Sequence, residues 1–457
     1  MSGWCSCCKD EIEYNFDDLT VDTQILPKRE KRNDLIERNQ KEFSPPKLSP
    51  TNNYLITFGS VTYGKVIDLN TLLKKPNTII NVKKIAFGDI HSLFLFETYN
   101  ENQTKNTHLY GYGSNNDGQL GLEYTFGKQN EYKYLVPINL DSYLVKGLPF
   151  FNKKTLSYYI DDIEVGNGFS LISIKYHNDD NIALYRFQLK KEDKYDTIVQ
   201  AKETKKATIF KENFNVFVFG NIIQFKCFGD RTIILTNKYL LMKGTLYNMD
   251  IAEDYKIIIE IKQTVLNLQT GINDCIILDS NSNLLLIGHG EYGEFGLEKT
   301  IDILESGKYL INDYFNKYNL TIVKISTGAR HSLVLCDNGN VYCFGDNSDG
   351  QCVGYEKIVS SPSIVDFGSE KEFIVDIQAG FNHSMAKSKS GKVFVWGDSA
   401  WDKLGFKETR VDQFTPVEVS DMKIRNVIRM FAGPLQSTFF ISGGIPLIPD
   451  QIEDKKE

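Results

Sequence analysis

Two short apolar runs joined by a polar turn form the clearest pattern in the chain, between residues 325 and 354. Residues 332–336 are almost entirely apolar, which predicts a strand that is covered on both faces. The turn Asp337-Asn338-Gly339 follows, and Asn and Gly accept the positive φ that a tight hairpin needs. Residues 341–344 form the predicted return strand, which ends at Gly345. The pattern therefore predicts a β-hairpin.

This hairpin pattern recurs along the chain, and each copy begins with a glycine. The seven leading glycines are Gly88, Gly166, Gly229, Gly271, Gly328, Gly380 and Gly433. A repeat of roughly fifty residues with two or more strands per unit is typical of a β-propeller rather than a helical solenoid. We therefore predict an all-β fold, a seven-bladed β-propeller.

The two ends of the repeat region together complete one blade. The last copy, at Gly433, lacks a return strand, whereas the first return strand, residues 54–59, lacks a leading half. We expect the N- and C-terminal strands to pair and close the ring, because closure removes edge strands that template aggregation. The predicted domains are a flexible N-terminal extension (1–50), the propeller (51–442) and a C-terminal tail (443–457).

The repeat resembles that of the regulator of chromosome condensation family. Its signature is a small residue and Gly followed by His-Ser, an apolar strand, a turn, an aromatic-Gly strand end and Asn-x-x-Gly-Gln-Leu-Gly. Residues 329–332 and 344–351 fit it well. The resemblance covers about residues 54–442 and is degraded from about 125 to 265. Kelch repeats fit less well because no Gly-Gly doublet recurs, and the WD dipeptide Trp401-Asp402 lies in a turn region.

We interpret the shared glycine and histidine positions as framework. They are Gly88, His91, Gly113, Gly118, Gly121, Gly328, His331, Gly345, Gly350, Gly380, His383 and Gly397. Three histidines in one repeat position could suggest a metal site, but equivalent positions lie around a ring, so we predict a structural hydrogen bond to neighbouring backbone instead. Other residues replace the histidine in four copies: Phe169, Thr232, Asp274 and Gln436. We expect those blades to be less regular.

No catalytic constellation stands out in the sequence. The segment 288–293 matches the dinucleotide pattern G-x-G-x-x-G, but it lies in repeat register with Gly345, so we predict a strand-to-turn element. We find no cysteine pairs with zinc spacing, no phosphate loop and no nucleophile elbow. The sequence thus predicts a protein that is not an enzyme and holds no cofactor or metal.

Composition narrows the partners and the compartment. The net charge of −7 argues against a dominant surface for nucleic-acid phosphates. No apolar run approaches the roughly 18 residues that span a bilayer, and no signal peptide is visible. The eight cysteines do not look like a disulfide framework, and five of them are scattered through predicted strands and turns: Cys227, Cys275, Cys336, Cys343 and Cys352. This favours free thiols in a reducing compartment. We expect a cytoplasmic protein without a transmembrane segment, with the nucleus as the alternative.

The N-terminus carries three cysteines within four positions: Cys5, Cys7 and Cys8. Such a cluster could be S-acylated and anchor the chain to a membrane, and incidental exposed cysteines are the alternative.

Two aromatic-rich segments interrupt the repeats, at residues 123–160 and 309–318. Because a propeller presents two loop-built faces, we predict a non-catalytic protein-protein interaction scaffold whose partners contact these insertions. The resemblance implies an alternative, guanine nucleotide exchange on a small Ran-like GTPase. It also implies chromatin binding, which the acidic balance weakens.

Overall fold

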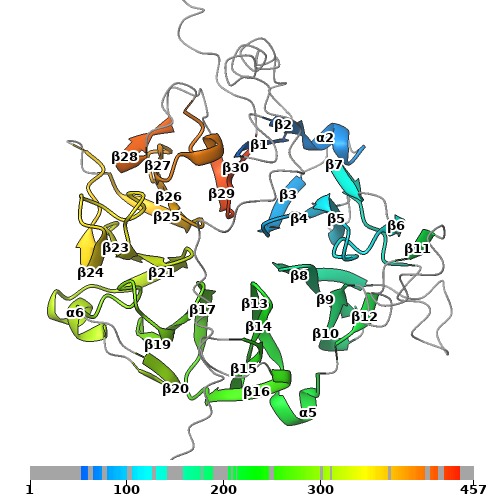
Figure 1. Ribbon diagram of the computed structural model, residues 1–457, viewed down its shortest axis with the longest axis horizontal. Helices are drawn as coiled ribbons and strands as arrows, with labels where there is room; N and C mark the ends of the chain where they lie inside the picture. Colours follow the sequence, from blue (N-terminus) through cyan, green and yellow to red (C-terminus); the bar gives the residue numbers. More distant parts are fainter. Residues whose placement is uncertain are drawn as a thin grey trace, which may run out of the picture. The chain divides into compact units, whose positions relative to one another are not determined.

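The computed structural model describes residues 53–59, 65–74, 80–99, 105–125, 130–141, 158–176, 179–188, 204–206, 209–212, 214–245, 252–298, 302–308, 311–368, 372–406, 412–419 and 427–442. Within these ranges the strands form seven four-stranded sheets and one two-stranded sheet. The seven sheets surround a common axis as the blades of a propeller (Figure 1). The predicted all-β, seven-bladed fold is confirmed. No helix of the described ranges is long and apolar enough to cross a bilayer.

Blades are numbered here by the order of their innermost strands, which are given first. Blade 1 contains β3 (Ile80–Phe87), β4 (His91–Tyr99), β5 (Lys105–Ser114) and β7 (Glu131–Pro137). Blade 2 contains β8 (Tyr158–Gly166), β9 (Phe169–Tyr176), β10 (Asp179–Phe187) and β12 (Ile209–Lys211). Blade 3 contains β13 (Ile222–Phe228), β14 (Arg231–Thr236), β15 (Tyr239–Gly244) and β16 (Ala252–Glu260). Blade 4 contains β17 (Val265–Thr270), β18 (Asp274–Asp279), β19 (Leu284–His289) and β20 (Asp302–Lys308).

The remaining blades come from the C-terminal half and from both ends of the repeat region. Blade 5 contains β21 (Ile322–Thr327), β22 (His331–Cys336), β23 (Val341–Asp346) and β24 (Ile358–Ile364). Blade 6 contains β25 (Ile374–Ala379), β26 (His383–Ser388), β27 (Val393–Gly397) and β28 (Gln413–Glu418). Blade 7 contains β29 (Val427–Ala432), β30 (Gln436–Ser442), β1 (Asn53–Gly59) and β2 (Lys65–Asp68). Short elements lie between strands: α2 (Leu69–Leu72), α5 (Val216–Phe219), α6 (Asn312–Lys317), the 3-10 turn η3 (Ala400–Asp402), and the ribbon of β6 (Glu123–Thr125) with β11 (Thr204–Lys206).

Blade 7 closes the ring with strands from both ends of the chain, as predicted. β1 runs antiparallel to β30, with Tyr54 opposite Ile441 and Gly59 opposite Gln436. The Thr438 hydroxyl also contacts the Thr57 hydroxyl at 3.0 Å, between strands 381 residues apart in sequence. The closure therefore leaves no inner or middle strand of this blade unpaired.

The hydrophobic core lies between the blades. The described residues form seven buried clusters, and each one joins two neighbouring blades. Between blades 5 and 6, for example, Leu333 packs with Ile377 and Trp396, which are all fully buried. The strands are apolar on both faces because each blade is covered on both sides. This explains the almost unbroken apolar runs in the sequence.

One expectation about the connecting segments needs correction. Residues 131–137, which were assigned to an insertion, form the outer strand β7 of blade 1. The second insertion contains a helix, α6, whose Phe315 is 2% exposed and packs into the core between blades 4 and 5, whereas Tyr318 is 54% exposed. That partners contact this insertion stays a prediction.

Other predictions fall outside the described residues. These are the N-terminal extension with Cys5, Cys7 and Cys8, and the tail after residue 442.

The first two strands of every blade form its inner hairpin, and their pairing shows the same one-residue register shift in each blade. The first strand carries one extra residue relative to the second, between Val82 and Lys84 in blade 1 and between Ile322 and Lys324 in blade 5. The same shift occurs in blades 2, 3, 4, 6 and 7. This shift therefore does not distinguish the blades that lack the repeat histidine. Two of those blades do carry further register shifts: blade 2 has one between β9 and β10, and blade 3 has two between β15 and β16.

Candidate functional site

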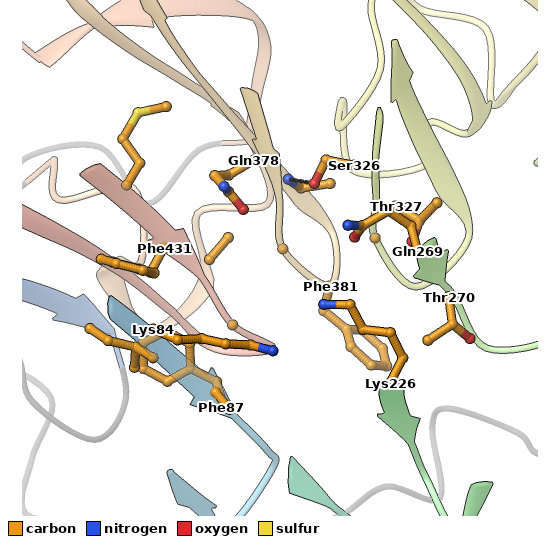
Figure 2. A pocket seen from close by; sticks show the side chains of 18 of the residues that line it. Lys84, Phe87, Lys226, Gln269, Thr270, Ser326, Thr327, Gln378, Phe381 and Phe431 are labelled. Carbon is orange, nitrogen blue, oxygen red and sulfur yellow. Dashed lines mark hydrogen bonds between the residues drawn. The ribbon is translucent and has the colours of Figure 1, made fainter. Parts of the chain in front are cut away.

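The innermost strands enclose a central channel. Residues from all seven innermost strands line a cavity of about 460 Å³: β3, β13, β17, β21, β25 and β29, and β8 through Glu164 alone. Its wall carries basic side chains among amides and hydroxyls. Figure 2 shows Lys84 of β3 and Lys226 of β13 in this cavity, opposite Gln378 and Ser326 of blades 6 and 5. A polar cavity of this size is within the range of small-ligand pockets, so it admits side chains rather than a folded domain.

Exposed aliphatic side chains lie near the N-terminal ends of five inner strands, at one end of the channel. Each is the extra residue of a bulge, and in four of these five blades the next residue lines the channel: Asn267, Lys324, Asp376 and Arg429. In blades 3 to 7 this residue is aliphatic and exposed. We call these five side chains the aliphatic rim: Ile223 (45% exposed), Leu266 (53%), Val323 (49%), Val375 (42%) and Ile428 (43%).

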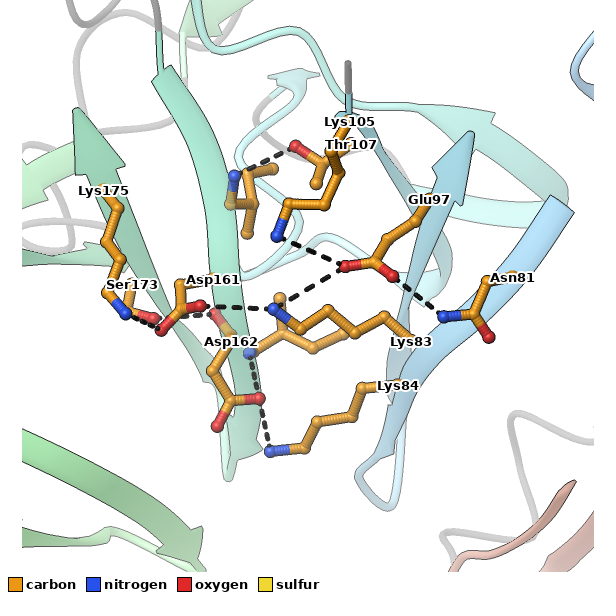
Figure 3. A network of polar contacts seen from close by, with 12 residues as sticks. Asn81, Lys83, Lys84, Glu97, Lys105, Thr107, Asp161, Asp162, Ser173 and Lys175 are labelled. Atoms are coloured by element: carbon orange, nitrogen blue, oxygen red, sulfur yellow. Dashed lines mark hydrogen bonds and ion pairs between the residues drawn. The ribbon is translucent and has the colours of Figure 1, made fainter. Parts of the chain in front are cut away.

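Blades 1 and 2 carry charges at the same position instead. Lys83 occupies the bulge position in β3 and Asp161 occupies it in β8, and their side chains form an ion pair at 3.2 Å. Lys83 also lies 3.8 Å from Glu97, and Lys175 lies 3.3 Å from Asp161 (Figure 3). This network binds β3 and β4 to β8 and β9. The rim is therefore a five-blade arc that is completed by an ion-pair network.

A second layer of polar side chains lies one step deeper in the channel. Lys84 pairs with Asp162 at 2.7 Å and with Glu164 at 2.6 Å, and Lys226 shares Glu164 at 3.0 Å. Burial by itself raises the pKa of Glu164, but Lys226 and Lys84 outweigh it and hold that pKa below its usual range. Across the channel Lys324 pairs with Asp376. These contacts link neighbouring blades.

The far end of the channel is narrowed by two aromatic rings. Phe228 of blade 3 and Phe381 of blade 6 stack with centroids 6.0 Å apart. Phe228 is the last residue of β13 and Phe381 follows β25, whereas the aliphatic rim lies near the N-terminal ends of the inner strands. The aromatic pair and the rim therefore mark opposite ends of the channel. Figure 2 shows Phe381 among the residues that line the cavity.

The predicted histidine positions form hydrogen bonds from one blade to the next. The Nε2 atoms of His91, His331 and His383 lie 2.9, 3.0 and 3.0 Å from the serine hydroxyls of Ser170, Ser384 and Ser437. Each serine immediately follows the residue that occupies the histidine position in the next blade. Ser170 and Ser384 in turn donate to the carbonyl oxygens of Gln119 and Gln351 at 2.7 Å, so the imidazoles of His91 and His331 donate their Nε2 protons.

This contact corrects the expected backbone partner of the imidazole and reveals a link that the repeat alone did not predict. Burial lowers the pKa of His91 and His331 to about 3, so both stay neutral donors. The described residues contain no group of three or more potential metal ligands.

The predicted glycines make room for this framework. They occupy three structural positions. The first is the end of the inner strand, where Gly88, Gly328 and Gly380 lie. The second ends the third strand opposite the histidine: Gly113, Gly345 and Gly397. The third lies in the loop that follows: Gly118, Gly121 and Gly350. At Gly328 a Cβ would lie 2.2 Å from Cε1 of His331, so glycine is required where the imidazole crosses the strand end.

One replaced position was misassigned by one residue. In blade 3 Phe228 pairs with Arg231, as Gly328 pairs with His331 in blade 5, so the leading position is Phe228 rather than Gly229. Arg231, not Thr232, takes the histidine position. Its guanidinium is buried and donates to the carbonyl oxygens of Gly271 at 2.6 Å and Ile272 at 2.9 Å in the next blade. Arg231 therefore replaces the histidine contact with another link between blades.

Asp274 takes the histidine position of blade 4 and is almost fully buried. Its Oδ2 atom has no hydrogen-bond partner among the described residues. Burial raises the pKa of Asp274 to about 7, and burial together with the charge of Asp274 raises the pKa of Glu294 to about 8. A protonated Asp274 presents an O–H donor where other blades present the imidazole N–H.

We expect Asp274→Asn to stabilise the propeller at pH 8 by roughly 1–3 kcal/mol and to have little effect near pH 4. The folded protein keeps the proton up to about pH 7, whereas the unfolded chain releases it near pH 4. The wild-type free energy of unfolding therefore falls relative to the variant as the pH rises from about 4 to about 7. Urea unfolding at several pH values measures this difference, and a difference that does not change with pH would contradict the assignment. Asp279→Asn in the same strand is the matched control, since Asp279 accepts from the amides of Asn281 and Asn283 at 2.9 Å.

The remaining candidate motifs are structural. The G-x-G-x-x-G segment continues from the end of β19 into a turn, as predicted. The cysteines Cys227, Cys275, Cys336, Cys343 and Cys352 are free and buried. Burial raises the pKa of Cys275 to about 12, which keeps its thiol protonated.

The aliphatic rim was not predicted from the sequence, although the sequence carries a signal for it. Each rim residue is the second of an apolar-apolar-polar-apolar run just before the leading position, as in Ile322-Val323-Lys324-Ile325. Two successive apolar residues break the alternation of a half-exposed strand, which indicates a bulge.

Comparison with known proteins agrees with the repeat pattern. Family models of the regulator of chromosome condensation (RCC1) repeat match residues 322–351, 374–400 and 338–386. The chain is 27% identical over 190 residues to the Protein RCC2 homolog of Xenopus laevis, covering 36% of each chain. It is 29% identical over 139 residues to the Regulator of chromosome condensation of Mus musculus, covering 30% of this chain and 31% of that protein. The chain thus matches about a third of the length of these two relatives.

Solved structures share the fold. A crystal structure of Kap60 bound to yeast RCC1 (Prp20) matches with a TM-score of 0.63 and 17% identity, covering 91% of this chain and 95% of that chain. At this identity the likeness concerns the fold alone.

Proposed function

This chain belongs to the regulator of chromosome condensation repeat family, and we propose that it is a non-catalytic protein-interaction scaffold that binds its partner at the channel mouth. The observation that carries this proposal is the aliphatic rim. Single exposed aliphatic residues are normal on a protein surface, but five at one structural position around one opening form a patch. Such patches mark interaction sites in soluble proteins.

The rim is held in place before any partner arrives. Its residues lie on paired strands, and the adjacent ion pairs Lys84–Asp162 and Lys324–Asp376 join neighbouring blades. A preformed surface loses little conformational entropy on binding, so a larger share of the contact energy contributes to affinity. The narrow, polar cavity behind the rim favours a partner that covers the mouth over a small apolar substrate.

We expect the double variant Val375→Ser/Ile428→Ser to recover its protein partner at least ten-fold less in affinity capture from native extract. The two residues lie on neighbouring blades, and serine removes their apolar contact without adding charge. The matched control is Ile257→Ser/Ile364→Ser, which changes two exposed isoleucines, 50% and 54% exposed, on the outer strands β16 and β24. Quantitative mass spectrometry compares the two variants with the wild type. Equal recovery by the rim variant and the wild type would refute the proposal.

Guanine nucleotide exchange on a small GTPase is the second candidate. It is favoured by the 29% identity to the mouse Regulator of chromosome condensation and by a structural neighbour, Prp20p of Saccharomyces cerevisiae, which has been studied for its binding to Gsp1p. Stimulated release of labelled GDP from a panel of small GTPases decides between the two. Release that also requires the rim would make the exchange partner the ligand of this same surface.

A further inference from the structure

We propose that the channel mouth recognises an acidic, apolar peptide segment of its protein partner, with aliphatic side chains on the rim and a carboxylate on Arg429. This inference rests on the proposed function and specifies the chemistry of the partner. Arg429 immediately follows Ile428 in β29, so the cation and an apolar rim residue lie side by side at the mouth.

Arg429 differs from the other cations of the channel in its partners. The basic residues that line the cavity are Lys83, Lys84, Lys226, Lys324 and Arg429, and the acidic ones are Glu164 and Asp376. Each of the four lysines pairs with a carboxylate within 4 Å. Arg429 has no carboxylate partner among the described residues. It is exposed, and its Nη1 atom donates to the carbonyl oxygens of Val82 at 3.2 Å and Lys83 at 2.9 Å.

These two hydrogen bonds orient the guanidinium without neutralising it. One nitrogen is held by the backbone of blade 1, while the rest of the planar group remains available at the junction of blades 7 and 1. A guanidinium oriented in this way can form a charge-assisted, two-pronged contact with a carboxylate. The positive charge is local, because the whole chain carries a net charge of −7.

The arrangement of apolar and charged groups defines the segment that fits. The rim runs over blades 3 to 7, and Arg429 lies at the end of this arc where the ion-pair network of blades 1 and 2 begins. A basic segment would meet the uncompensated charge of Arg429 and be repelled. An uncharged apolar segment would cover the guanidinium and leave it unpaired, which is costly. A segment with Asp or Glu within a few residues of Leu, Ile, Val or Phe satisfies both features.

A random peptide library displayed on phage tests the proposal directly. We expect the wild-type protein to enrich peptides in which Asp or Glu lies within two or three residues of a large apolar residue. Arg429→Glu should lose these peptides at least ten-fold and enrich peptides with Lys or Arg instead. Lys256→Glu, on the outer strand β16, makes the same charge change at an exposed position away from the mouth and should keep the wild-type preference.

Two further measurements test the proposal even if Arg429→Glu folds poorly. Arg429→Lys keeps the charge and should retain the acidic preference with weaker binding. The affinity of the wild-type protein for a selected acidic peptide should fall several-fold when NaCl is raised from about 50 to about 300 mM, because screening weakens an exposed ion pair.

The outcomes separate this inference from the scaffold proposal. No enrichment, enrichment of basic or uncharged peptides by the wild type, or retention of acidic peptides by Arg429→Glu would overturn the acidic segment. If Val375→Ser/Ile428→Ser still loses its partner in that case, the scaffold proposal stands and only the chemistry assigned to the partner fails. If the rim variant also keeps its partner, both fail.

Discussion

Gly345→Ala is expected to destabilise the propeller by about 3 kcal/mol or more. Gly345 ends β23 with φ +117°, a backbone conformation that alanine rarely adopts. A Cβ there would lie 2.4 Å from the carbonyl oxygen of Arg330 and 2.6 Å from Cα of His331. Both contacts involve the backbone of β22 and its turn, so the neighbour cannot move without breaking the hairpin. Urea unfolding of the purified protein measures the loss.

Gly391→Ala is the matched control for this prediction. Gly391 also has a positive φ, +92°, but nothing lies within 4 Å of the place where its Cβ would be. It therefore carries the conformational strain without the collision, and we expect a loss of only about 1 kcal/mol. If the two variants unfold at the same urea concentration, the close approach of Gly345 to β22 does not constrain the fold.

His331→Ala is expected to cost about 2–4 kcal/mol, because it removes a buried side chain and a buried hydrogen bond between blades 5 and 6. The Ser384 hydroxyl would keep its bond to the Gln351 carbonyl but lose its donor. In a double-mutant cycle with Ser384→Ala, the sum of the two single-variant losses in free energy of unfolding should exceed the loss of the double variant by about 1 kcal/mol. Purely additive losses would show that the two residues do not act together.

His108→Ala provides the comparison for a contact within one blade. The Nε2 atom of His108 also lies 2.9 Å from a hydroxyl, that of Thr98, but both residues belong to blade 1 and the imidazole is only partly buried. We expect a loss of about 1 kcal/mol or less. A loss as large as that of His331→Ala would mean that burial and blade-to-blade linkage do not distinguish the repeat histidine.

Local signals predicted the framework well, and their failures have a common cause. The turn glycines and the His-Ser pairs recur at visible intervals, so the blade number and the ring closure followed from counting. Counting failed at Gly229, because a glycine in the hairpin turn was taken for the leading position. Strand pairing sets the register there, and a one-residue shift leaves the apolar pattern of the following strand unchanged.

The candidate site was less accessible to sequence reasoning. The aromatic content of the segment 309–318 did not separate Phe315, which is buried between blades 4 and 5, from Tyr318, which is 54% exposed. Conversely, Val323 and Ile428 look like ordinary core residues in sequence and are exposed at the mouth. Whether an apolar side chain is covered depends on the neighbouring blade, which is a different segment of the chain.

The sequence by itself determined the repeat, the number of blades, the closing pair of strands and the residues that must be glycine. These features are local, because a tight turn or an apolar strand needs particular residues within a few positions. Only the tertiary structure decided that the repeat histidines donate to the next blade, that five bulge residues form one rim, and that Arg429 has no carboxylate partner among the described residues. Each of these depends on the distance between residues of different blades, and that distance is set when the ring closes.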